Sequence, residues 1–375
     1  MNKDNSSMDM DPEIAKKLFN QGAVLFITGV PKGTEFGIDL CSYVIGDNFR
    51  GVKMIPPGPH YVWCAATGPY GDVAPRVGFT HFFEEQELLV REWDANNEEL
   101  RDRQIAEPEL EKRRLKENLK MLDSYLAPYD FRYCGEWRKL TDTITKQCVA
   151  RCRPDLGTIR TNVELLSCPD AERPRGPLTE THPSMSAKLV NDENDLLPQL
   201  KPVDGTAPRF TLVPERIPKN STPAEISKHS LDCIQACNNL LSNFNPTQDL
   251  IQEIQLSFVF FMVGYSVESL AYWRKVLALL SHSEEAVSKY RLLYMKYSEV
   301  LVHQLPHLPE ELMEASERNT VYKDIRSLLV NLNLSGLHKS AEFLSKKLQN
   351  SMNWTFEGLL DEDPEDMPVI VETNE

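Results

Sequence analysis

Between residues 23 and 93, short apolar runs alternate with clusters of Gly, Pro and acidic residues. The runs are rich in β-branched and aromatic residues, which is typical of strands in a sheet. The connections are too short for crossover helices, so we expect antiparallel pairing in a β-sandwich or barrel-like domain. The predicted strands cover residues 23–30, 34–39, 42–45, 49–55, 60–66, 76–83 and 88–93.

After residue 97 the apolar positions change to a helical spacing. Leucines recur at about one per helical turn between Leu110 and Leu122, amid Glu, Lys and Arg, which predicts an amphipathic helix within 97–123. A second helix is predicted at 136–152, and a short one at 11–22. We expect the helices within 97–123 and 136–152 to pack on the sheet and complete an N-terminal domain over residues 1–153.

The next segment, residues 154–221, differs in composition. It holds ten of the 25 prolines and few long apolar stretches. Such a segment buries too little surface to offset the entropy of ordering it, which predicts a linker. Within it, residues 209–213 could lie extended against a domain surface.

An all-helical domain is predicted for residues 222–356. Thr222, Pro223 and Glu225 form a helix-start signal with a capping box. The run 256–263 is apolar on nearly all sides, so its helix should lie centrally. Further helices are predicted at 247–263, 266–281, 284–304, 309–317, 320–334 and 337–352.

These patterns define the expected fold class, which is α+β with two domains. An N-terminal antiparallel β-sandwich or barrel-like domain with packed helices precedes a C-terminal all-α domain. Short turns between the helices suit either a bundle or a repeat-like stack, and no repeat of fixed period decides between them.

The C-terminal stretch, residues 357–375, holds eight carboxylate side chains and no Lys or Arg. A disordered acidic tail is one interpretation of this composition. However, a β-branched run follows the acidic residues, and such a run suits a strand that is added to the edge of a partner's sheet. The candidate partner-binding residues are Pro368, Val369, Ile370, Val371 and Glu372.

Charge and targeting signals limit the partners. The net charge of −15 and the pI of about 5.1 argue against a protein whose main task is gripping nucleic acid, because phosphate binding needs clustered Lys and Arg. The polar N-terminus shows no signal peptide, and the longest apolar run, 256–264, is too short to span a bilayer. We therefore expect an intracellular soluble protein with no nucleic-acid or membrane partner.

The residue spacings do not match the motifs of metal sites or phosphate loops. The eight cysteines form no CxxC pair, and no His lies at ligand spacing beside Cys148/Cys152 or Cys233/Cys237, so free buried thiols are expected. In the loop 29–34 the Lys precedes the second glycine, which does not suit a phosphate loop. The aromatic residues of 61–83 suit a sandwich core better than an RNA-stacking platform. We expect no catalytic residue, cofactor or metal.

Two stretches, 31–39 and 49–60, carry a resemblance. Their sequences, Pro-Lys-Gly-Thr-Glu-Phe-Gly-Ile-Asp and Phe-Arg-Gly-Val-Lys-Met-Ile-Pro-Pro-Gly-Pro-His, closely resemble the N-terminal signature of the AAR-two family of splicing factors. Residues 222–232, 258–264 and 272–277 also resemble that family. We expect the signature to be mainly structural, with Phe36 in the core. Its residues are Gly33, Thr34, Glu35, Phe36, Gly37, Asp39, Arg50, Gly51, Lys53, Pro56, Pro57 and Gly58.

The resemblance implies a function in mRNA splicing. Proteins similar to this one are non-enzymatic chaperones of U5 snRNP assembly, and they act in the cytoplasm and nucleus before the tri-snRNP forms. They bind the RNase H-like and Jab1/MPN-type domains of the Prp-eight scaffold, which keeps the Brr-two helicase and RNA away. By this resemblance, the run from Pro368 to Glu372 would be the strand that bridges the two partner domains.

Two alternatives remain open from the residues alone. One is a general helical-repeat adaptor that binds many short peptides. The other is an enzyme with a β-domain and a helical lid. A deep pocket lined by perturbed carboxylates or His would favour the enzyme, whereas a broad groove with an ordered tail would favour a binding protein.

Overall fold

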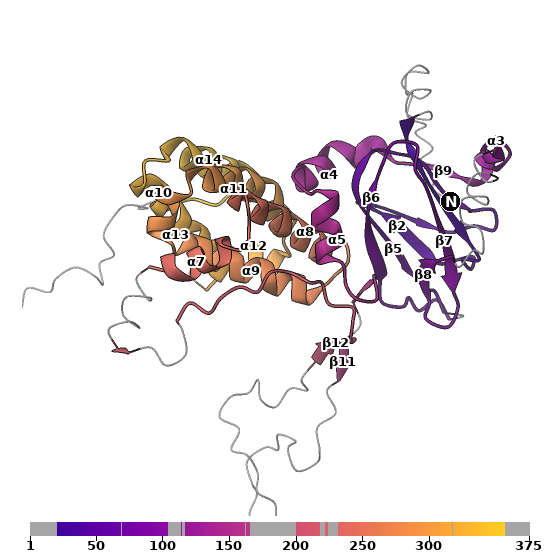
Figure 1. Cartoon of the computed structure of the whole chain (residues 1–375), viewed down its shortest axis with the longest axis horizontal. Coiled ribbons are helices and arrows are strands. Elements are labelled where there is room, and N and C mark those ends of the chain that lie inside the picture. Colours follow the sequence, from indigo (N-terminus) through magenta and orange to yellow (C-terminus); the bar gives the residue numbers. More distant parts are fainter. Residues whose placement is uncertain are drawn as a thin grey trace, which may run out of the picture. The chain divides into compact units, whose positions relative to one another are not determined.

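The chain forms two compact units, which are described separately below (Figure 1). The first comprises residues 1–131, 149–209 and 263–268, and the second comprises 132–148, 210–262 and 269–375. The computed structural model describes residues 21–68, 70–103, 114, 117–161, 163–165, 200–217, 222, 223, 232–316 and 318–356. Three predicted features lie outside these residues. They are the helix at 11–22 except for its last two positions, Glu225 of the capping box, and the tail from residue 357.

Two five-stranded sheets dominate the first unit, with strand orders β8-β7-β1-β4-β9 and β10-β6-β5-β2-β3. Each of the seven strands predicted between residues 23 and 93 is present, because each run pairs with a neighbour and buries apolar side chains. The strands are β1 Ala23–Thr28, β2 Glu35–Ile38, β3 Cys41–Val44, β4 Gly51–Ile55, β5 Gly58–Ala65, β6 Val77–Phe83, β7 Leu88–Asp94, β8 Glu99–Asp102, β9 Ala127–Pro128 and β10 Ile159–Arg160. A separate pair joins β11 Val163–Leu165 to β12 Leu200–Pro202.

The prediction that every pair would be antiparallel is wrong for two pairs. Strand β1 pairs in parallel with β7, and β4 pairs in parallel with β9. A parallel pair needs a long crossover connection, which is usually a helix. Here the connection from β1 to β7 is supplied by the strands between them, most of which belong to the other sheet.

The helix predicted within 97–123 is replaced in part by a strand. Residues 99–102 form β8, in which Leu100 is buried and Arg101 pairs with Glu92 of β7 at 2.9 Å between Nε and Oε1. Residues 104–113, 115 and 116 of the range lie outside the described residues, whereas Arg114 and Glu117 are helical. A short helix, α3 Leu119–Leu122, and a 3₁₀ turn, Asp123–Tyr125, follow. Pairing with β7 therefore outweighs helix propensity at its start.

The predicted helix 136–152 is two helices, α4 Cys134–Thr141 and α5 Lys146–Cys152. Helix α4 belongs to the helical unit, where Leu140 joins the apolar core. Our expectation that this segment packs on the sheet is wrong for α4, whose contacts group it with the helices. Hydrogen bonds as well as apolar contacts hold this segment against α8. Thr143 and Thr145, in the turn between α4 and α5, donate Oγ1 hydrogen bonds of 2.6 Å to Gln255 and Gln252.

The second unit is helical, as predicted. Its helices are α7 Ile234–Leu241, α8 Leu250–Met262, α9 Val267–Ser281, α10 Glu284–Lys289, α11 Arg291–Gln304, α12 Glu310–Met313, α13 Thr320–Leu334 and α14 His338–Met352. Every residue of α8 from Leu250 to Phe260 is buried, which is the central position expected from the apolar run 256–263. The predicted helix 284–304 is interrupted at Tyr290. Among the described residues, no helix has both the length and the apolarity needed to cross a bilayer.

Replacing Gly51 by Ala should destabilise the first unit by about 2–4 kcal/mol. Gly51 has a φ of +130°, and an added Cβ would lie 1.9 Å from the Leu25 carbonyl oxygen of β1. Urea unfolding of the variant measures the change. The control is Gly46→Ala, since a Cβ there meets nothing within 4 Å. Equal stability of both variants would contradict the prediction.

Candidate functional site

The signature encloses a buried polar network centred on Asp39. Its carboxylate lies 2.6 Å from Nδ1 of His60 and accepts hydrogen bonds from the Tyr129 hydroxyl at 2.7 Å and the Tyr61 amide at 3.0 Å. Nε2 of His60 lies 2.8 Å from the Pro56 carbonyl oxygen. A His–Asp pair can serve catalysis, but all of these side chains are buried and out of reach of a substrate. The network therefore joins β2, β5, the Pro56 turn and the segment after β9.

Other signature residues shape the turns and the core. Phe36 is fully buried, as expected, and Thr34 is nearly so. Gly33 and Gly58 have φ values of +89° and +134°, which a residue with a side chain rarely adopts. Gly58 begins β5, directly after Pro56 and Pro57.

The charged signature residues contact other residues of the first unit. Arg50 donates a 2.8 Å hydrogen bond to the carbonyl of Phe49. Lys53 pairs with Asp123 at 2.5 Å between Nζ and Oδ1. Glu35 lies opposite Val44 of β3 in the sheet. These contacts indicate that most signature residues stabilise the fold of the first unit. The candidate partner-binding residues Pro368, Val369, Ile370, Val371 and Glu372 lie outside the described residues.

Gly37 supports an aromatic stack on its sheet. Trp63 of β5 lies across Gly37 so closely that a Cβ would come within 2.1 Å of the indole. The Arg76 guanidinium lies 3.7 Å from the Trp63 ring centroid and 4.1 Å from that of Tyr265. The cation is thus held between two aromatic faces, an arrangement favoured by the ring quadrupoles.

The same stack joins two distant signature stretches. Arg76 donates a 2.9 Å hydrogen bond from Nη1 to the Val263 carbonyl, and Thr161 donates one of 3.1 Å to the Gly264 carbonyl. Residues 263–268 therefore pack within the first unit, although they comprise the connection from α8 and the start of α9. The first signature contributes Gly37 to this site, and the apolar run before residue 265 contributes the two acceptors.

In the second unit, residues 210–213 lie extended along the helices, which confirms the expectation for 209–213. The Phe210 ring stacks on Tyr272 of α9 with centroids 4.5 Å apart. Thr211 donates to the fully buried Glu253 of α8 from its amide at 3.0 Å and from Oγ1 at 2.9 Å, and the Tyr272 hydroxyl donates at 2.6 Å. We call residues 210–213 the strap.

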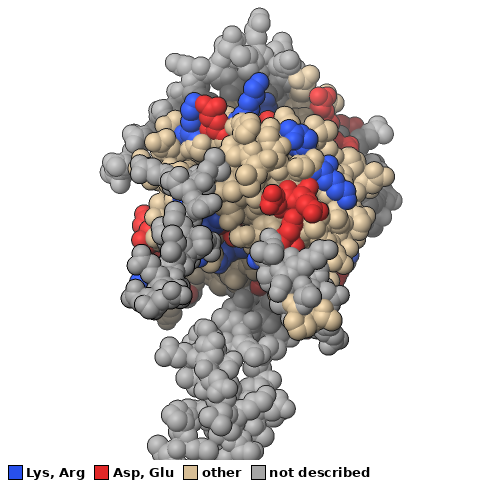
Figure 2. Space-filling view, turned by 90° about the vertical axis from the view of Figure 1, so that its left-hand side faces the viewer, with Lys and Arg blue, Asp and Glu red and all other residues tan. Residues whose placement is uncertain are grey.

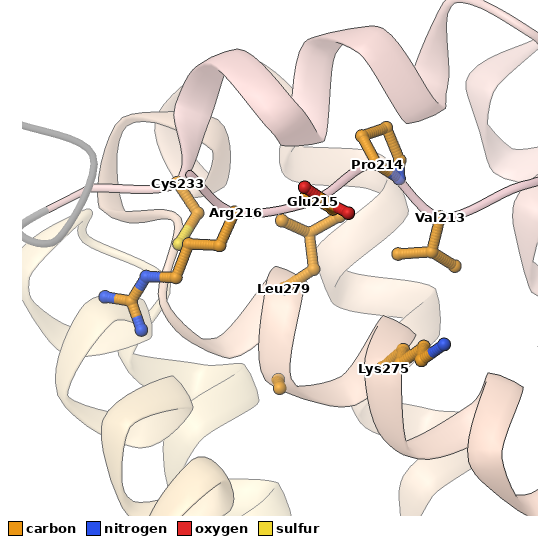
Figure 3. A pocket seen from close by; sticks show the side chains of 8 residues that line it. Val213, Pro214, Glu215, Arg216, Cys233, Lys275 and Leu279 are labelled. Atoms are coloured by element: carbon orange, nitrogen blue, oxygen red, sulfur yellow. The ribbon is translucent and has the colours of Figure 1, made fainter. Parts of the chain in front are cut away.

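A pocket of about 260 Å³ lies where the strap continues beside α9 (Figure 3). In Figure 3, Arg216 and Lys275 lie toward opposite ends, with Glu215 between them. Burial raises the pKa of the Cys233 thiol, so this thiol is a poor nucleophile. The lining residues are Val213, Pro214, Glu215, Arg216, Cys233, Lys275, Ala278 and Leu279. No histidine and only one carboxylate are among them, which does not match the pocket that would favour an enzyme.

Two further buried thiols are also poor nucleophiles. Burial raises the pKa of Cys64 to about 12 and that of Cys237 to about 11. Both are protonated at neutral pH and are poor metal ligands. Cys148 and Cys152 are buried and form no disulfide with a described cysteine. Within the described part of the chain, no group of three or more His, Cys, Asp or Glu side chains could hold a metal ion.

An aromatic clamp holds the point from which the tail departs. Trp354 is buried and donates a 2.6 Å hydrogen bond from Nε1 to the Met313 carbonyl. The Tyr322 hydroxyl donates to the Thr355 carbonyl at 2.7 Å, and its ring stacks on Phe356 with centroids 5.6 Å apart. The origin of the tail on α13 is thereby well defined.

Two family models match the chain. The AAR2 N-terminal domain covers residues 21–154, and the AAR2 C-terminal repeat region covers residues 210–357. The chain belongs to the AAR2 family. It is 34% identical to Protein AAR2 homolog of Mus musculus and 33% identical to that of Homo sapiens, in both cases over 99% of this chain and 98% of the relative. The Caenorhabditis elegans homolog is 30% identical over 92% of this chain and 98% of its own length.

The resemblance of the signature is thus confirmed, and AAR2 membership supports a splicing-related, non-catalytic role. The sequence reveals the signature but not the other residues that organise the interior of each unit. Tyr129, Arg76, Tyr265 and Glu253 carry no local motif. Arg76 was noticeable only as one of few cations near an aromatic run.

Replacing Arg76 by Lys should loosen residues 263–266. Lys retains the charge but not the planar group that stacks between two rings. We expect backbone amide hydrogen exchange of this segment to rise about tenfold, since a partly buried cation–π contact contributes about 1–2 kcal/mol. The control is Arg101→Lys in β8, which should leave the segment unchanged. Unaltered exchange in the Arg76 variant would show that the stack does not hold the turn.

Truncating Phe210 tests the strap. Phe210→Ala removes the ring stacked on Tyr272 and should destabilise the helical unit by about 2 kcal/mol, because the side chain is only partly buried. Thermal unfolding measures this, and exchange at residues 210–213 should increase. Leu212→Ala is the matched control, since Leu212 is 86% exposed. A larger effect at Leu212 than at Phe210 would contradict this assignment.

Proposed function

We propose that this protein is a non-enzymatic assembly chaperone of the U5 snRNP. Its partner is the Prp-eight scaffold, which it binds through the RNase H-like and Jab1/MPN-type domains. The observation that carries the proposal is the match of both the β-rich and the helical parts of the chain to the AAR2 family. By holding the two partner domains together, it delays binding of the Brr-two helicase and of RNA, in the cytoplasm and nucleus.

Electrostatics support a protein partner. With a net charge of −15, the chain repels phosphate backbones at a distance. Figure 2 shows one face on which basic and acidic side chains are interspersed over a larger uncharged area. The described residues visible there form no basic stripe of the kind that tracks a nucleic-acid strand.

The tail contributes the strand that bridges the partner domains. Its origin is held by Tyr322, Trp354 and Phe356. Thirteen positions separate Phe356 from Val369, which allows a reach of up to about 45 Å. The acidic hinge favours extension by self-repulsion. Val369, Ile370 and Val371 then add a strand to a partner sheet through main-chain hydrogen bonds.

Substituting Ile370 by Pro should weaken Prp-eight capture at least about tenfold. Proline removes an amide donor in the proposed strand. A salt-resistant pull-down from cell extract measures capture by the full-length protein, the Ile370→Pro variant and a variant ending at Phe356. Asp361→Pro in the acidic hinge is the matched control and should bind normally.

Each outcome of this pull-down is informative. Capture of Prp-eight without the Brr-two helicase, lost on truncation, would support the chaperone function and the tail strand together. Intact capture by the variant ending at Phe356 would overturn the role of the tail. Recovery of vesicle or membrane proteins in place of Prp-eight would favour the general adaptor.

A further inference from the structure

Strand β3 forms one edge of the sheet β10-β6-β5-β2-β3. It pairs with β2 in antiparallel register, with Phe36 opposite Tyr43 and Glu35 opposite Val44. No described strand lies on its other side. An open strand edge presents main-chain donors and acceptors to any extended chain that approaches.

The alternation of main-chain hydrogen bonds shows which groups of β3 face away from β2. The Ile45 amide donates to the Thr34 carbonyl on the β2 side, and the Asp39 amide at the far end of β2 donates to Tyr61 of β5. Because antiparallel bonding alternates along a strand, Cys41 and Tyr43 bond toward β2. The main-chain groups of Ser42 and Val44 therefore point away from the sheet, at positions where both residues are exposed.

Charged side chains protect the other long edge in this unit, whereas no described ion pair lies on β3. On β8, Arg101 pairs with Glu92 and Asp94, Arg91 pairs with Asp102, and Glu99 pairs with Arg160. Charged side chains at an edge discourage pairing with another chain. Strand β3, Cys-Ser-Tyr-Val, has no charged residue, and its Val44 is 74% exposed.

The charge beside β3 defines the partner. Glu35 lies directly opposite Val44 and has no ion-pair partner among the described residues, whereas the nearby Asp47 already pairs with Lys32 at 2.8 Å. A Lys or Arg on an added strand would have a side chain long enough to approach the Glu35 carboxylate past Val44. Aliphatic side chains beside it would cover Val44.

We propose that β3 is a docking edge for an extended segment of another protein in which basic and aliphatic residues alternate. The segment adds a strand beside Ser42 and Val44 through main-chain hydrogen bonds. Side-chain specificity comes from Val44 and Glu35. This edge is formed by residues other than those of the acidic tail, so the proposal does not depend on the bridging strand proposed above.

The test uses the full-length protein and a synthetic peptide, Lys-Val-Arg-Val-Lys-Val, with an acidic peptide, Glu-Val-Glu-Val-Glu-Val, as comparison. We expect the basic peptide to slow amide exchange at Ser42 and Val44 and to bind at least about tenfold more tightly than the acidic one. Slowed exchange confined to another segment, or equal binding of both peptides, would overturn the proposal.

The variant Val44→Pro blocks the edge. Its amide faces outward and is not needed by β2, so proline should be tolerated there, and an unchanged unfolding midpoint checks this. We expect at least about tenfold weaker peptide binding, whereas Val44→Ile should bind normally and Glu35→Gln should lose the preference for the basic peptide. Undiminished binding to a folded Val44→Pro variant would overturn the proposal.

Two further measurements distinguish binding at β3 from binding at the acidic tail and from pairing between two copies of the chain. The variant ending at Phe356 should bind the basic peptide as the full-length protein does, whatever the outcome for Prp-eight capture. Self-association that Val44→Pro abolishes, measured by sedimentation without peptide, would overturn the proposal in favour of a second copy of the chain as occupant.

Discussion

A guanidinium group held between two aromatic rings connects parts of this protein that are far apart in the chain. Arg76 lies between Trp63 and Tyr265, and Trp63 in turn rests on Gly37. The contact places residues 263–268 in the β-rich unit, although α8 before them lies at the centre of the helical core. The chain therefore passes between the two units several times, and neither compact unit is a single run of consecutive residues.

In this arrangement the interior is structural, and the proposed binding elements lie at a strand edge and in the tail. The polar and ionisable groups of the interior have structural roles. Asp39 and His60 join strands, and Glu253 accepts hydrogen bonds from the strap. The buried thiols of Cys64 and Cys237 stay protonated. The two elements that we propose to engage partners are the strand edge β3 and the tail that begins after the aromatic cluster of Tyr322, Trp354 and Phe356. Both would bind by adding a strand, a mode in which main-chain hydrogen bonds supply affinity and flanking charges supply selectivity.

Comparison of the predicted and observed elements shows where local pattern suffices. Strands such as Val77–Phe83 were predictable because β-branched and aromatic residues stand between turn residues. The parallel pairing of β1 with β7 was not, since it depends on strands of the other sheet supplying the crossover. The assignment of α4 to the helical unit was missed as well, because Leu140 packs into a core formed mostly by residues at least 93 positions further along the chain.

The sequence by itself determined the two classes of domain, the extents of most strands and helices, the strap and the family, because each depends on residue type at short spacing. Only the tertiary structure decided which sheet each strand joins, which unit each helix joins, and that Arg76, Asp39 and Glu253 are the polar residues that organise the interior. These depend on contacts between residues 13 to 189 positions apart, for which no local periodicity exists. The same reason applies to β3: its composition was visible, but its place at an open edge follows only from the strand order.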